Sequence, residues 1–192
     1  MRHGHWMIVA MAAVVLPACE LVESTVPMGF EPVTVSEEDW DGLWLGDEGV
    51  VAITVTDEEA GELTASFLFR ASRSATPPHE LDNYHVIVRR SGDWLFANTH
   101  YEDSSDWLWM RVKLEGDQLI AWAPDPSAIS ALVSRGLLPG TIDDSGGGER
   151  IILDPLTPAQ DELIRSGSEG MLMAWDDPMV LMRIRRSVGV PR

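Results

Sequence analysis

The sequence holds little cysteine, little positive charge and no long hydrophobic run. Its 192 residues include one cysteine, so an internal disulfide and a cysteine-rich metal site are both excluded. Lysine and arginine together number 14 against 31 aspartate and glutamate residues, which gives a formal net charge of −17. A surface of that charge repels phosphate backbones and anionic lipid headgroups. We therefore exclude nucleic acid as a partner and expect no membrane binding that depends on charge.

The beginning of the chain has the pattern of a secretory signal. Arg2 lies in a short start without acids, and an apolar run of thirteen residues follows from Trp6 to Ala18. A positive start, an apolar core of about 7–15 residues and small residues at the end are typical of such signals. A membrane-spanning helix needs about 20 apolar residues. We predict that residues 1–18 are a cleaved leader and not a permanent transmembrane anchor.

The end of this run, Leu16-Pro17-Ala18-Cys19, resembles the lipobox of bacterial lipoproteins. In that family the cysteine thiol receives a diacylglycerol and the preceding peptide is removed. The resemblance implies a covalent lipid on Cys19 as the membrane anchor, no other cofactor, and a place in the cell envelope. Glu20 favours the outer membrane, facing the periplasm, over the inner membrane. A plain secretory signal with an incidental cysteine is the alternative.

Residues 19–38 are predicted to form the lipidated cysteine and a flexible acidic tether. Leu21–Glu38 contains Pro27, Gly29 and Pro32 among scattered acids, and no helical or strand period persists in it. Such a segment would hold a folded domain away from the membrane.

Residues 39–187 are predicted to form one mostly antiparallel β domain, with residues 188–192 as a tail. Apolar and polar residues alternate in short segments separated by turns, as in β-sandwiches and barrels. Capping residues predict two helices, near 126–135 after Asp125 and near 158–166 after Thr157. Segment 107–114 illustrates the alternation, with an aliphatic face of Leu108, Met110, Val112 and Leu114, and an opposite face of Trp107, Trp109, Arg111 and Lys113.

Gly42-Leu43-Trp44 resembles the Gly-x-Trp motif that opens lipocalin-like (calycin) barrels. In those barrels the tryptophan closes the base and packs beneath an arginine from the final strand. The resemblance implies that Gly42, Trp44 and Arg183 close a barrel here, with a cation–indole contact of about 0.5–2 kcal/mol. The expected fold is mainly β with two helices, either an antiparallel lipocalin-like barrel or a strongly curved sheet. The two helices before the last strands depart from the family, and the chain as a whole resembles uncharacterised bacterial lipoproteins.

Catalytic and metal-binding patterns are weak in this sequence. His79-Glu80 lacks the second histidine of a zinc-protease helix, and Ser166–Gly170 lacks the first glycine of a nucleophile elbow. His85 and His100 lie on adjacent predicted strands, where surface histidines beside an acidic loop are the simpler interpretation. We therefore predict neither an enzyme nor a metal site.

The most suggestive residues are four tryptophans, Trp94, Trp107, Trp109 and Trp122. Facing inward, they would line a cavity for a small apolar ligand; facing outward, they would form a patch for an envelope protein. In a third interpretation they fill the core or lie under the helices. The sequence favours non-catalytic binding of a small apolar or amphiphilic molecule. A structural or protein-interaction module is the alternative, and a hydrolase is the least supported class.

Overall fold

The computed structural model describes residues 21–47, 49–70, 79–100, 105–144, 148–166 and 172–184. The predicted leader, Cys19 and the tail at 188–192 lie outside these ranges. Within the described part of the chain, no helix is both long and apolar enough to cross a bilayer.

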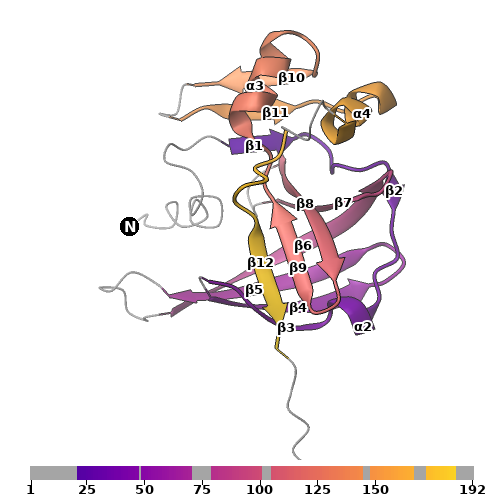
Figure 1. The fold of residues 1–192 in the computed structure, drawn as a ribbon, viewed down its shortest axis with the longest axis vertical. Coiled ribbons are helices and arrows are strands. Elements are labelled where there is room, and N and C mark those ends of the chain that lie inside the picture. Colours follow the sequence, from indigo (N-terminus) through magenta and orange to yellow (C-terminus); the bar gives the residue numbers. More distant parts are fainter. Residues whose placement is uncertain are drawn as a thin grey trace, which may run out of the picture.

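Eight antiparallel strands close into a barrel (Figure 1). Each strand pairs with the next along the chain, and the last strand inserts between β9 and β3 to complete the ring. This confirms the prediction of a mainly β chain and decides for a barrel over an open curved sheet. The barrel strands are β3 (Gly42–Leu45), β4 (Gly49–Asp57), β5 (Glu62–Arg70), β6 (His79–Ser91), β7 (Trp94–His100), β8 (Trp107–Glu115), β9 (Gln118–Trp122) and β12 (Met179–Arg183).

Tight hairpins join the strands at one end of the barrel, which we call the base. Gly61 shows why glycine is needed there: its φ is +72°, and a Cβ would lie 2.7 Å from the carbonyl oxygens of both Val33 and Val88. At the opposite end β3 and β4 are joined by a short turn, whereas the other connections are longer, and the longest of them joins β9 to β12. We call this opposite end the mouth.

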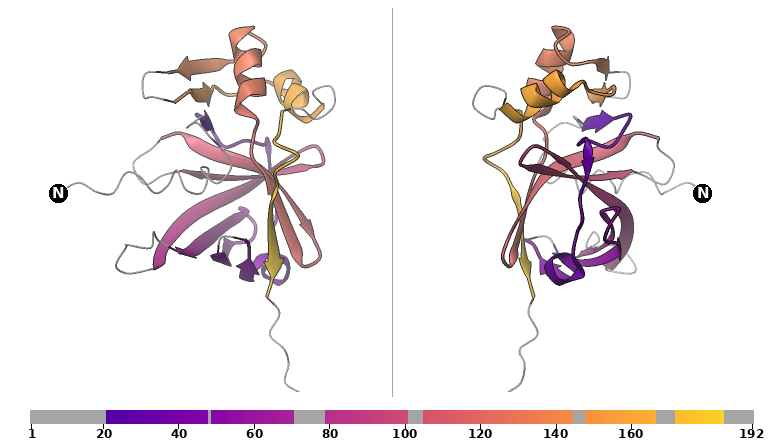
Figure 2. Two further views of the ribbon diagram at one scale, coloured as in Figure 1. Left: turned by 60° about the vertical axis from the view of Figure 1, so that its left-hand side comes forward. Right: turned by 90° about the vertical axis from the view of Figure 1, so that its right-hand side faces the viewer.

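The chain between β9 and β12 forms a second layer on the outside of the barrel, seen as a separate tier in both views of Figure 2. Its own hydrophobic core, with Ile129, Leu153 and Ile164 fully buried, is distinct from the core inside the barrel. Both predicted helices are present in it. We call this layer the cap; it consists of α3 (Pro126–Ser134), β10 (Gly140–Asp143), β11 (Arg150–Leu153), α4 (Pro158–Ser166) and, from the start of the described chain, β1 (Leu21–Ser24).

The prediction of a flexible tether over residues 21–38 is wrong for the described part of that segment. Strand β1 pairs in parallel with β11 and also meets the start of β8, so it joins the cap to the barrel. Val22, Met28, Val33 and Val35 are buried. The segment lacks a regular period because Val22 and Met28 pack in the cap core, whereas Val33 and Val35 pack in the barrel core. The segment also contains β2 (Glu31–Pro32), which pairs with β6, and α2 (Glu37–Trp40).

Arg183 lies against Trp44 at the base of the barrel. Trp44 is fully buried, and the Arg183 guanidinium carbon lies 4.8 Å from the centroid of its ring. The same guanidinium donates to the carbonyl oxygens of Glu38, at 2.9 Å, and Asp41, at 3.0 Å. Gly42, with φ +143°, turns the chain between these carbonyls and β3. One cation therefore joins the last strand, α2 and the first barrel strand.

Replacing Arg183 with methionine tests this closure. We expect the free energy of unfolding to fall by about 2–4 kcal/mol, because the cation–indole contact and two charged hydrogen bonds are lost. Urea denaturation measures the change. Arg90→Met is the matched control, since Arg90 is an exposed arginine on β6. Equal losses in the two variants would contradict the role of Arg183.

Candidate functional site

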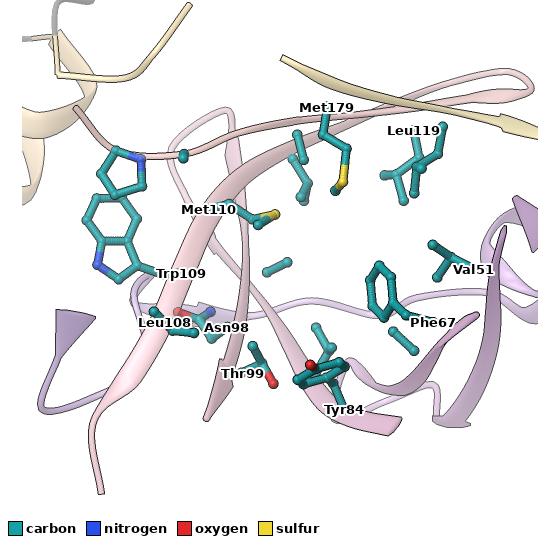
Figure 3. Close-up of a pocket in the computed structure, with 18 of the residues that line it drawn as sticks. Val51, Phe67, Tyr84, Asn98, Thr99, Leu108, Trp109, Met110, Leu119 and Met179 are labelled. Atoms are coloured by element: carbon teal, nitrogen blue, oxygen red, sulfur yellow. The ribbon is translucent and has the colours of Figure 1, made fainter. Parts of the chain in front are cut away.

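The inside of the barrel holds a cavity of about 480 Å³ (Figure 3). Pockets for small molecules occupy about 300–1,000 Å³, so this volume suits one ligand. Almost every barrel strand contributes inward-facing apolar side chains to it. Prominent among them are Val51, Phe67, Met110, Leu119 and Met179.

Three alanines explain why the barrel is not filled. An eight-stranded barrel is just wide enough for its side chains to fill the interior or to leave room for one small ligand. Ala65, Ala97 and Ala121 occupy inward positions on β5, β7 and β9, and all three line the cavity. In a sequence pattern they count as ordinary apolar residues. Their small volume on three different strands leaves the space empty.

The two ends of the cavity differ in chemistry. Trp40 of α2, which is buried, contributes to the apolar lining on the side of the base. Toward the mouth, the lining includes Leu21 of β1 together with Pro124 and Asp177 from the two ends of the cap insertion. The cap and the barrel therefore share the mouth between them.

The four predicted tryptophans do not line the cavity together. Trp109 is the one of the four that reaches it, near the cap (Figure 3). Trp94 and Trp122 pack in the cap core, and Trp107 packs edge-on against the ring of His100 with 4.8 Å between centroids. Trp94, Trp109 and Trp122 therefore fit the third of the three interpretations of the sequence, in which the tryptophans fill the core or lie under the helices.

Arg111 organises the tryptophans outside the barrel wall. From the outer face of β8, its guanidinium carbon lies 4.3 Å, 4.8 Å and 4.7 Å from the ring centroids of Trp94, Trp122 and Trp175 respectively. Burial lowers the pKa of the Arg111 side chain below its ordinary value. No ion pair joins it to any acid in the described ranges, so the indole faces are its main electrostatic partners. Trp175 was not among the predicted site residues, because no local sequence pattern relates it to β8.

Buried polar contacts hold the cap and the N-terminal segment on the barrel. Within the cap, the carboxylate of Glu23, which is 1% exposed, pairs with Arg150, and that hydrogen bond raises the pKa of Arg150. Arg150 also donates to Asp106, directly before β8 of the barrel, at 2.9 Å. Asp161 of α4 pairs with Arg165 and accepts a hydrogen bond from Ser91 of the barrel. These contacts make the cap a fixed part of the wall.

A buried asparagine makes a similar attachment on β7. Asn98 accepts from the backbone NH of Met28 at 2.6 Å and donates to the carbonyl of Met28 at 3.1 Å. Two such bonds hold the backbone of the N-terminal segment against the outer face of the barrel.

The two histidines considered for catalysis lie beside different residues. His85 lies 3.2 Å from a carboxylate oxygen of Glu62, and both side chains are exposed. His100 packs against Trp107. Among the described residues, no group of three or more histidine, cysteine, aspartate or glutamate side chains is arranged to hold a metal ion.

An exposed apolar row crosses the barrel wall formed by β12, β3, β4, β5 and β6. It follows the strand register, in which each residue is the cross-strand partner of the next. The row contains one methionine and no tryptophan, so the tryptophan patch expected for a protein-interaction role is not part of it. Its members are the exposed residues Met182, Leu45, Leu68 and Leu81, with half-buried Val50 between Leu45 and Leu68.

Comparison with known proteins adds no family assignment, since no family model, curated protein or solved structure matches the chain. The structure itself shows an eight-stranded antiparallel barrel with Arg183 against Trp44 at its base.

Replacing Arg111 with methionine tests the tryptophan cluster. We expect a loss of about 1–3 kcal/mol in unfolding free energy, because one partly buried cation contacts three indoles. We also expect a weaker near-ultraviolet circular dichroism signal, since Trp94, Trp122 and Trp175 lose their common contact. Arg111→Lys keeps the charge and should retain part of both. An unchanged tryptophan spectrum in the methionine variant would show that Arg111 does not order these rings.

Proposed function

We propose that this protein binds a small apolar or amphiphilic molecule inside its barrel and does not act on it chemically. The observation that carries the proposal is the cavity of about 480 Å³ lined mainly by apolar side chains. Burial of apolar ligand surface there contributes about 25 cal/mol per Å². The cavity already exists in the folded chain, so little of that free energy is spent on rearrangement.

The lining supports binding over catalysis. Its charged members are Asp125 and Asp177, and both belong to the mouth. The carboxylate of Asp125 accepts hydrogen bonds from the hydroxyl of Ser127 and the backbone NH of Ala128, which caps α3. A general acid–base pair needs two titratable groups that converge on one reacting atom. The described lining offers a hydrophobic container with an acidic entrance.

We further propose that Cys19 carries a lipid that anchors the protein in the cell envelope, with the periplasmic face of the outer membrane favoured. Each buried acyl methylene contributes about 0.8 kcal/mol, so two or three chains outweigh the unfavourable charge. Leu21, two residues after Cys19, lines the cavity. Two residues span at most about 7 Å. The anchor would therefore hold the mouth of the barrel close to a bilayer, where apolar ligands are concentrated.

Filling the cavity tests the proposed ligand site. In Ala97→Phe a ring occupies the interior, and we expect the affinity for the neutral fluorescent probe N-phenyl-1-naphthylamine to fall at least about tenfold, or about 1.4 kcal/mol. Ala52→Phe is the matched control, because Ala52 is on the same sheet but does not line the cavity. Both variants should retain the wild-type far-ultraviolet spectrum. The ligand site inside the barrel would be refuted if the wild-type protein did not bind the probe. It would also be refuted if the two variants bound the probe equally well.

Labelling with radioactive palmitate tests the anchor. We expect label in the wild-type chain and none in Cys19→Ser, which should also leave the membrane fraction, because it lacks the thiol that receives the diacylglycerol. A serine variant that stays in the membrane fraction would contradict the lipid anchor. This result is independent of the probe measurement.

A further inference from the structure

The charged residues in the described lining of the cavity are acidic, and they lie at its mouth. Asp125 and Asp177 are acidic, and the described lining contains no lysine, arginine or histidine. The other polar side chains of the lining, those of Tyr84 and Thr99, are uncharged, and Asn98 uses its side chain to hold Met28 outside the barrel wall. A ligand whose chain fills the barrel would place its head among these groups.

The described arginines near the cavity wall are engaged elsewhere. Arg150 pairs with Glu23 and Asp106, and Arg165 pairs with Asp161 and Glu162. Arg111 is held among the indoles outside the wall. No cation in the described lining is therefore available to pair with an anionic head. A carboxylate head that leaves water without such a cation carries the cost of burying an unpaired charge.

Asp177 is the acid whose carboxylate is free to interact electrostatically with the head of a ligand. It is exposed, lies directly before Pro178 and β12, and its carboxylate makes no hydrogen bond or ion pair with any described residue. Asp125, in contrast, uses its carboxylate to cap α3. The hydroxyl of Tyr84 donates to Asp82, at 3.3 Å, so a further acid lies beside the lining. The described acids at the entrance attract a cation and oppose an anion.

Resting on the proposed function, we propose that the cavity selects amphiphiles with a neutral or cationic head and rejects those with a carboxylate or phosphate head. The apolar interior supplies the affinity and accepts any chain of suitable size. The entrance supplies the selection, with Asp177 as the residue that faces the head. The expected ligands are therefore neutral lipids, long-chain alcohols or alkylammonium compounds, and free fatty acids are excluded.

Three probes with the same ten-carbon chain test the selection: 1-decanol, decanoate and decyltrimethylammonium. Each is titrated by calorimetry into the anchor-deleted protein at pH 7.5 and low salt, below the concentration at which it forms micelles. Low salt keeps the screening length long enough for the entrance charge to act. We expect decyltrimethylammonium to bind at least as tightly as decanol, and decanoate to bind at least about tenfold more weakly than decanol.

Two variants with the same change in net charge distinguish the effect of the charge at the entrance from the effect of the overall surface charge. Asp177→Asn removes the mouth carboxylate, and Asp93→Asn removes an exposed one from the β6–β7 turn at the base. We expect Asp177→Asn to strengthen decanoate binding about threefold or more and to leave decanol unchanged. Asp93→Asn should leave all three probes close to wild type.

The outcomes distinguish this inference from the proposed function. If none of the three probes binds, the ligand site itself is refuted. If decanoate binds as tightly as decanol, the site stands and the selection is overturned. If the two asparagine variants change decanoate binding equally, the overall negative charge selects the ligand, and the assignment to Asp177 is overturned.

Discussion

The structure depends on one wall of the barrel that buries both of its faces. On β8, Met110 and Val112 face the interior, while Trp109 and Arg111 face the cap. A strand buried on both sides cannot exchange its faces without placing an arginine in the apolar interior. This constraint sets the register of the neighbouring strands and fixes the position of the cap. The cavity therefore lies on the inner side of this wall and the cap on its outer side.

Contacts on the outer face of the barrel wall offset the packing that the cavity lacks. The cap core, the indoles around Arg111 and the buried attachments of Glu23, Asn98 and Asp161 all lie outside the barrel wall. They hold the strands together without using space inside the ring. The small residues Ala65, Ala97 and Ala121 can therefore leave a cavity where larger side chains would otherwise provide the packing. The proposed function follows from this division between a packed core under the cap and a barrel core that encloses a cavity.

Local patterns predicted the parts of the fold that local forces determine. The alternation in residues 107–114 assigned the two faces of β8 correctly, and the capping residues before 126 and 158 located α3 and α4. The motif at Gly42 and Trp44 led to Arg183, its cross-strand partner. Residues 21–38 were misjudged because their contacts are to β6, β8 and β11, which are distant in sequence. The tryptophans could be placed on a face, but the sequence could not show what covered that face.

The sequence by itself determined the strand-rich class, the helix starts, the acidic charge and the short list of chemistry-bearing residues. These follow from side-chain period, capping and charge, which act over a few residues. Tertiary structure alone decided that the ring is closed, that three alanines meet in one empty space and that Trp175 joins Trp94 and Trp122 around Arg111. Each of these features requires contacts between segments far apart in the chain. The free energy that favours those contacts comes from burying apolar surface throughout the folded domain.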